Sequence, residues 1–211
     1  MKPSHRHRAL FALVLAALAL ASSAKAEVTD EEYAVYEALL QQIDWKLPKA
    51  GPEYVVERYV IRDTTSAEGT SAKSIRDLQK LDRAALAMFE ERNRTHDRLV
   101  THRFPNVTVW LVTGVEYNDI FLHPGKGGAT VSDGRFTEKA DSWSYFEGMH
   151  PRAQGLLTVS KVGFGEDGRQ ALLYFRDQLQ GTRGNGCFAR LEKTPEGWKV
   201  RQVDRMGCPI R

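Results

Sequence analysis

The C-terminal third of the chain is a series of short strand-like segments, and this pattern restricts the fold more than any other feature. The segments are rich in β-branched and aromatic residues, and glycine-rich or Pro-Gly sequences separate them. They lie at residues 156–162, 171–175, 187–191 and 198–203. Sequential strands joined by tight turns pair as an antiparallel meander, so the sequence predicts such a sheet here.

Helical signals dominate the sequence before this meander. Thr29 and Glu32 form a capping box, and apolar residues at helical spacing predict a helix from residue 30 to about residue 45. A second apolar stripe predicts a helix that starts near Ser74 and ends between Asn93 and Leu99. The remaining expected elements are a strand at 54–62, strands within 104–122 with a bulge at Gly114, and a short helix at 141–149.

This order of elements predicts an α+β fold in which two N-terminal helices pack on one face of an antiparallel β-meander sheet. The NTF2-like cone, in which helices curl against a sheet and enclose a cavity, is one form of this arrangement. The sequence contains no internal repeat and no linker long enough to divide the chain. We therefore expect residues 27–211 to form a single domain.

Residues 1–26 have the three-part layout of a secretory signal peptide. A short basic segment precedes the apolar run 9–21, and residues 24–26 (Ala-Lys-Ala) form a small-x-small cleavage site. The run is 13 residues long, whereas a helix that spans a membrane needs about 20. We expect a bacterial protein that is periplasmic or secreted and has no membrane span after cleavage; an uncleaved membrane anchor is the alternative.

Net charge gives no argument for a nucleic-acid partner or a membrane surface. The chain carries a net charge of +3, but the predicted signal peptide supplies four basic residues and no acidic ones. Residues 27–150 have a net charge of −6 and residues 151–211 a net charge of +5. The two parts can attract each other within one domain. The alternative is a basic sheet face for an anionic envelope or extracellular partner, with Arg176, Arg190 and Arg201 as binding residues.

The chain has two cysteines, Cys187 and Cys208. An even number of cysteines in an oxidising compartment favours a disulfide, here with a structural role. A hairpin turn at residues 194–197 would place Cys187 opposite position 204, so the chain has to bend back at Gly207 to close the bridge. Two buried thiols are the alternative.

The sequence carries no specific motif for a cofactor, a metal or a nucleophile. Residues 163–168 match G-x-G-x-x-G, but a strand-like segment follows where a dinucleotide site needs a helix, so this run predicts a hairpin turn. The histidines lack metal-ligand spacing, and the serines lack the G-x-S-x-G pattern. We expect no cofactor and no metal. The weak catalytic candidates are Tyr117, His150 and Ser160.

Several C-terminal motifs resemble those of a family of secreted bacterial proteins of uncharacterised function. The motifs are residues 160–164 (SKVGF), 170–174 (QALLY) and 197–200 (GWKV), within a core of the form S-x-VGF…ALxY…GxW. The resemblance implies export, but it implies no activity, cofactor or catalytic residue. The chain departs from the family in the glycine-rich run 180–186, which lacks the two cysteines of its relatives.

Two functions from different classes follow from these features. The first is a non-catalytic binding or interaction domain that recognises a protein, glycan or lipid partner, and the sequence favours this over an enzyme. The second is a small hydrolase or a ligand-carrying protein with a pocket of NTF2-like shape. A concave pocket that contains Tyr117, His150 and Ser160 would favour the second function.

The signal-peptide interpretation predicts that the exported protein begins at Glu27. Intact-mass measurement of the protein recovered from the periplasm or the medium checks this, because removal of 26 residues changes the mass by a defined amount. An exported protein that retains Met1 would contradict the prediction.

Overall fold

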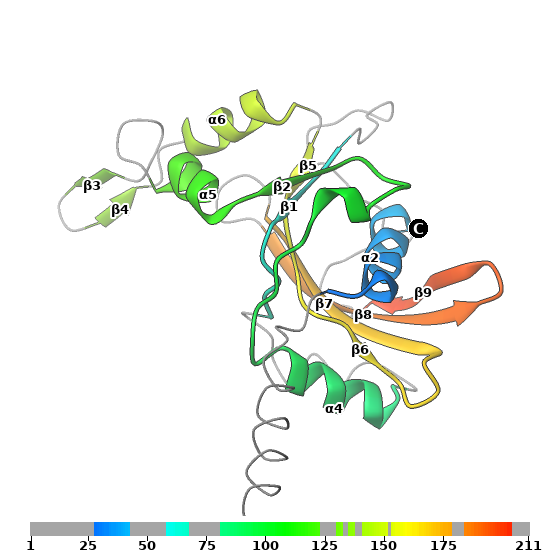
Figure 1. The fold of residues 1–211 in the computed structure, drawn as a ribbon. Coiled ribbons are helices and arrows are strands. Elements are labelled where there is room, and N and C mark those ends of the chain that lie inside the picture. The colour runs from blue at the N-terminus through cyan, green and yellow to red at the C-terminus, as the bar shows by residue number, and fades with distance from the viewer. Residues whose placement is uncertain are drawn as a thin grey trace, which may run out of the picture.

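The computed structural model describes residues 28–42, 58–67, 81–122, 130–132, 135–137, 141–151, 153–178 and 184–203. Its elements form an α+β fold (Figure 1). In chain order they are α2 (Asp30–Gln42), β1 (Arg58–Arg62), α4 (Arg83–Arg92), the 3-10 turn η1 (Thr101–Arg103), β2 (Val109–Val112), α5 (Gly114–Phe121), β3 (Thr130–Ser132), β4 (Arg135–Thr137), α6 (Asp141–Met149), β5 (Ala153–Val159), β6 (Gly163–Phe164), β7 (Gln170–Gln178), β8 (Gly184–Thr194) and β9 (Gly197–Val203). Within these ranges, no helix has the length and apolar character needed to cross a membrane.

Seven strands form one mixed sheet in the order β2-β1-β5-β7-β8-β9, with β6 paired to β7. Strands β5, β7, β8 and β9 are antiparallel, which confirms the predicted meander. Strand β1, however, is parallel to both β2 and β5. The expectation of a wholly antiparallel sheet is therefore wrong. Long connections that contain helices separate β1 from β2 and β2 from β5, and such crossovers return the chain in the same direction.

Helix α2 covers one face of the sheet. The amide of Thr29 donates to Glu32 Oε2 at 3.0 Å, and the amide of Glu32 donates to Thr29 Oγ1 at 3.3 Å, which confirms the predicted capping box. The helix packs on alternate strand residues and forms the main core with them. This core includes Tyr33, Tyr36, Leu39 and Leu40 from α2, and Ile61, Leu157, Val159, Leu173, Phe175 and Leu191 from the sheet.

Two separate helical units cover the opposite face. Helices α5 and α6 pack over Val60 and Leu156, with the rings of Trp143 and Phe146 buried as predicted. Helix α4 packs over a second cluster made by Ala85, Phe89, Leu172, Tyr174 and Phe188. Figure 1 shows α4 and the α5–α6 pair at different ends of the sheet. Helices therefore lie on both faces, and the expectation of one covered face is wrong.

Two elements begin at different residues from those predicted. Helix α4 begins at Arg83 because the side chain of Asp82 caps it and accepts from the amide of Ala84 at 2.8 Å; the expected cap, Ser74, lies outside the described residues. Residue Gly114 does not form a strand bulge but begins α5. Thr113 and Glu116 form a second capping box there, and this T-x-x-E pattern is the signal that the strand interpretation missed.

The β8–β9 hairpin confirms the predicted turn at residues 194–197 but changes the register beyond it. A bulge between Arg190 and Leu191 shifts the register by one residue, so Ala189 pairs with Val203 and not with residue 202. Cys187 is fully buried in the main core. Cys208 lies outside the described residues, so the disulfide stays a prediction.

The glycine run 163–168 forms the hairpin between β6 and β7, as predicted. Gly168 has a φ of +67°, a conformation that favours glycine in a tight turn. Gly163 has a different role, because it lies directly against α4. A Cβ at this position would overlap the carbonyl oxygen of Ala85, so only glycine lets the helix approach β6 this closely.

Replacement of Gly163 by alanine should lower the free energy of unfolding by about 1–3 kcal/mol, because α4 has to move away from β6. Gly148→Ala in α6 is the matched control, since a Cβ there meets nothing within 4 Å. Chemical denaturation of both variants checks the prediction. A Gly163→Ala variant as stable as Gly148→Ala would contradict it.

Candidate functional site

A pocket of about 300 Å³ opens on the sheet face that carries α4 and α5–α6. Tyr174, from the cluster under α4, and Tyr117, which packs against the cluster under α5–α6, both line it. The pocket therefore lies between the two helical units. Strand β7 contributes Tyr174, Arg176 and Gln178, which share one face because side chains alternate along a strand.

A polar row crosses three strands at the base of the pocket. Thr158 on β5 pairs with Arg176 on β7. On the other side, the parallel register pairs Ile61 with Leu157, so the next residues along, Arg62 and Thr158, are neighbours on the pocket face. Adjacent strands are about 4.8 Å apart, so the Cα atoms of Arg62 and Arg176 are about 10 Å apart. Thr158 lies between the two arginines.

The pocket forms where three parallel strands end. Arg62 is the last residue of β1, Thr158 is next to the last of β5, and Tyr117 lies in the helix that follows β2. At the carboxyl ends of parallel strands the chain leaves the sheet, and side chains there are free to contact a ligand. The parallel pairing of β1 thus brings together residues far apart in the sequence.

Hydrogen bonds position the loop after β1, which lines the pocket. The amide of Thr65 donates to the carbonyl of Asp97 at 2.9 Å, and the amide of Asp97 donates to Thr65 Oγ1 at 2.9 Å. The amide of Ser66 donates to the carbonyl of Val159 at 2.8 Å. His96 Nδ1 lies 2.7 Å from the carbonyl oxygen of Thr65. A carbonyl only accepts, so His96 Nδ1 donates this hydrogen bond.

The described lining of the pocket is basic. It contains Arg62, Arg176 and His96, and it contains neither Asp nor Glu. Arg62 lies under the ring of Tyr117, with its guanidinium carbon 4.0 Å from the ring centroid. Among the described residues, its buried Nε has no hydrogen-bond partner, and no carboxylate forms an ion pair with Arg62 or Arg176. The nearby Arg98, in contrast, pairs with Asp63 at 2.9 Å.

Ser160 is buried behind this pocket and its hydroxyl is used by the backbone. Ser160 Oγ accepts from the amide of Tyr174 at 2.8 Å and donates to the carbonyl of Lys161 at 2.9 Å. The hydroxyl of Tyr36 donates to the Ser160 carbonyl at 2.9 Å. Burial raises the pKa of Tyr36 well above its ordinary value, so Tyr36 remains a donor at neutral pH.

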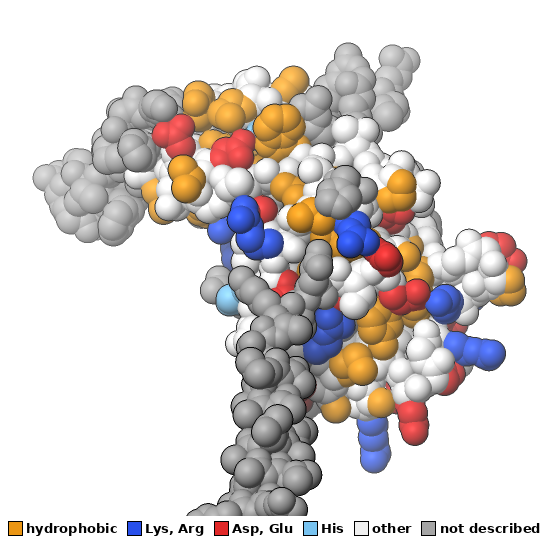
Figure 2. Space-filling model, in the orientation of Figure 1, with side chains coloured by type: hydrophobic (Ala, Val, Ile, Leu, Met, Phe, Trp, Pro, Cys, Tyr) orange, Lys and Arg blue, Asp and Glu red, His pale blue; other side chains and the backbone are white. Residues whose placement is uncertain are grey.

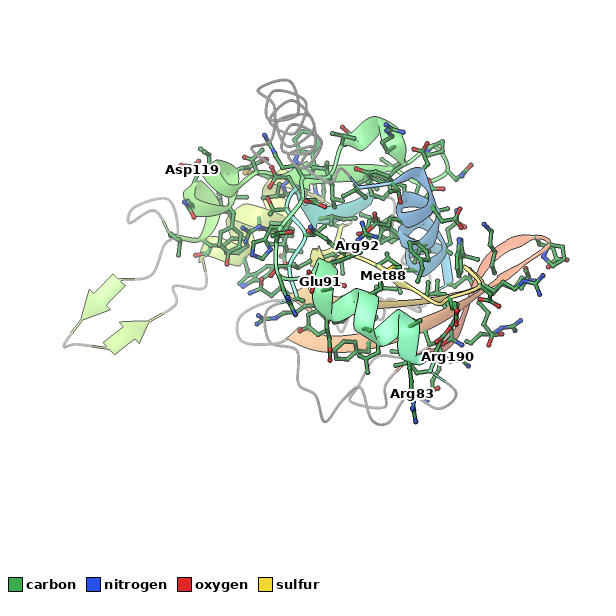
Figure 3. The ribbon with its side chains drawn as sticks, turned by 60° about the horizontal axis from the view of Figure 1, so that its bottom comes forward. Arg83, Met88, Glu91, Arg92, Asp119 and Arg190 are labelled. Atoms are coloured by element: carbon green, nitrogen blue, oxygen red, sulfur yellow. The ribbon has the colours of Figure 1, made fainter. Side chains whose placement is uncertain are left out.

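Two ion pairs hold the segment that follows Ser160. Lys161 Nζ lies 2.9 Å from Asp97 Oδ2, and both side chains are buried. Glu32, at the start of α2, pairs with Arg92 at 2.7 Å and accepts from the amide of Val162 at 3.2 Å. Arg92 lies at the C-terminal end of α4 (Figure 3). This segment therefore joins α2, α4 and the sheet.

The other two catalytic candidates lie apart from Ser160. Tyr117 lines the pocket, whereas His150 does not. His150 follows α6 and is 2% exposed, with its ring centroid 5.0 Å from that of Phe146 and 5.5 Å from that of Trp110. The structure does not bring Tyr117, His150 and Ser160 together into one site.

The three predicted binding arginines fall into two groups. Glu192 pairs with both Arg190 at 2.5 Å and Arg201 at 3.0 Å. The hydrogen bond from Arg190 lowers the pKa of Glu192, so this carboxylate is charged at neutral pH. Arg190 lies on β8 (Figure 3), away from the pocket lining, while Arg176 lines the pocket. Arg176 is thus the member of the set that a ligand in the pocket can contact.

The sequence interpretation missed Arg62 and Thr158, and it assigned His96 to a basic cluster at the end of a helix, with anion binding as the alternative. A signal was present for Arg62, because it directly follows the apolar residues 59–61 of β1. The strand period of two also places Tyr174, Arg176 and Gln178 of β7 on one face, although polarity does not single out this face because Asp177 lies on the other. No sequence pattern places His96 at this pocket, since hydrogen bonds between distant segments position it.

Metal binding and known relatives give no further assignment. Within the described ranges, no three His, Cys, Asp or Glu side chains are grouped closely enough to hold a metal ion. Comparisons of the chain with protein-family models, with curated proteins and with solved structures found no match.

Ser160→Ala should lower the free energy of unfolding by about 1–3 kcal/mol, because the buried amide of Tyr174 loses that acceptor. Ligand binding by the folded variant should stay within about twofold of the parent, since Ser160 does not line the pocket. Thermal denaturation and binding titrations check both parts. Unchanged stability together with lost binding would show that Ser160 acts on a ligand.

Proposed function

We propose that the protein is an exported, non-catalytic binding domain whose pocket holds a small anionic ligand. The observation that carries this proposal is the row of Arg62, Thr158 and Arg176 across the pocket base. The two guanidinium groups have no carboxylate partner among the described residues. Arginine presents a fork of N–H donors that matches the oxygens of carboxylates and phosphates.

The size and lining of the pocket support a small, polar ligand. A volume of about 300 Å³ is at the lower end of the range for small-molecule sites. Hydroxyl and amide groups from Thr64, Ser66, Tyr174 and Gln178 surround the arginines. A ligand that carries an anionic group and hydroxyl groups would satisfy both kinds of lining.

The pocket is a better binding site than the basic sheet face expected from charge alone. Arg190 and Arg201 share Glu192, which offsets much of their charge and orients both side chains. Export remains part of the proposal on sequence grounds, from the apolar run 9–21 and the cleavage site that follows it. The ligand is then a component of the envelope or the medium.

A ligand-carrying protein or small hydrolase of NTF2-like shape, with two N-terminal helices on its sheet, is the second proposal. The pocket itself favours the carrier form, because its described lining offers hydroxyl, amide and basic groups but no carboxylate. A hydrolase would also need an activated nucleophile near these groups. Ser160 Oγ is engaged with the backbone instead, so we favour binding.

Arg176→Gln should weaken binding of an anionic probe about tenfold or more, because a charge-assisted hydrogen bond is worth about 1.5–3 kcal/mol. Titration calorimetry with glycerol 3-phosphate and with D-glycerate, and with glycerol as the neutral reference, measures this. Arg201→Gln is the control, since Arg201 is paired with Glu192 outside the pocket. Absence of binding by both anions, or equal weakening by Arg201→Gln, would contradict the proposed function.

A further inference from the structure

Resting on the proposed function, we infer that the anionic group bound in the pocket is a phosphate monoester. The site provides two arginines on separate strands, with a threonine hydroxyl between them. A planar carboxylate has two oxygens in one plane, and the fork of one arginine satisfies both. A second arginine about 10 Å away along the sheet is not needed for that task.

A phosphate monoester fits this arrangement in both shape and charge. It has three terminal oxygens arranged around phosphorus and carries a charge of about −1.5 to −2 at neutral pH. Arg62 and Arg176 approach from opposite sides of Thr158, so each guanidinium can reach different oxygens while the threonine hydroxyl donates to a third. The two positive charges then match the two negative charges of the ligand.

The buried Nε of Arg62 is a second, independent indication. This N–H has no hydrogen-bond partner among the described residues, although the guanidinium is fixed under the ring of Tyr117. An unsatisfied buried donor is costly, and charged donors are the most costly. A phosphate oxygen at the base of the pocket would satisfy it. The ring of Tyr117 restricts the movement of Arg62, so the donor is already positioned before a ligand binds.

The phosphate ester can come from a soluble metabolite or from a lipid headgroup. Figure 2 shows hydrophobic side chains over α5 and α6. On α5, the helix that carries Tyr117, Val115 is 82% exposed; Leu122, which follows the helix, is 61% exposed. Apolar groups at this position would lie beside the acyl chains of a lipid whose headgroup enters the pocket. The bound group is a phosphate monoester in both cases, so the experiment has to distinguish the two sources.

The test compares two small ligands that share a 1,2-diol and end in different anionic groups, a phosphate monoester in glycerol 3-phosphate and a carboxylate in D-glycerate. The affinity for glycerol 3-phosphate should exceed that for D-glycerate about tenfold or more, which corresponds to loss of one charge-assisted contact. Arg62→Gln and Arg176→Gln should each remove most of this difference, and Arg201→Gln should leave it unchanged. Arg176 is exposed at the pocket, so its variant should fold even if Arg62→Gln does not. Thermal denaturation of each variant checks that it is folded.

A second arm uses phosphatidylcholine vesicles with and without phosphatidic acid, whose headgroup is a phosphate monoester. Binding of the vesicles that contain phosphatidic acid, lost in Arg176→Gln, supports the inference with a lipid source. Binding that Arg176→Gln does not weaken would overturn it. Equal affinities for glycerol 3-phosphate and D-glycerate, both weakened by Arg176→Gln, would overturn the phosphate inference while the anion pocket stands. Failure of every anion to bind would overturn the proposed function as well.

Discussion

The structure depends on one buried polar segment, residues 160–162, where the chain leaves β5. Its backbone and side chains bind Tyr36 and Glu32 of α2, Arg92 of α4 and Asp97 of the loop that follows α4. Buried charges are tolerated because each has a partner of opposite charge. The same segment orients the pocket, since Asp97 holds Thr65 and Ser160 holds the backbone of Tyr174. The contacts that join the helices to the sheet therefore also position the residues of the pocket.

The pocket follows from the way in which this sheet is covered. Helix α2 closes one face, while α4 and α5–α6 close the two ends of the other face. The middle of that face carries Arg62, Thr158 and Arg176 in place of apolar residues. Apolar side chains at these positions would bury more apolar surface. The two arginines also hold like charges near each other. Such an arrangement costs stability, and the proposed anionic ligand would offset that cost on binding.

Local features of the fold were predictable, and long-range ones were not. The capping box of α2, helix α6 and the β7–β9 meander depend on residues close in sequence, and the structure confirms them. The parallel pairing of β1 depends on crossovers of dozens of residues, so no local pattern reveals it. The residues of the site show the same difference between local and long-range features. The sequence named Arg176 as a binding residue of a basic sheet face and Tyr117 as a catalytic candidate, and only the folded chain brings them together with Arg62 and His96 in one pocket.

The central claim is that an anion binds at the row of Arg62, Thr158 and Arg176 across the pocket base. Titration of the isotopically labelled protein with glycerol 3-phosphate, followed by two-dimensional NMR of backbone amides and arginine Nε groups, tests it most directly. The account predicts that the largest shifts occur at Arg62, Thr158 and Arg176, with little change at Arg190 and Arg201. Shifts centred on Arg190, Glu192 and Arg201, with no change at Arg62, would contradict the account.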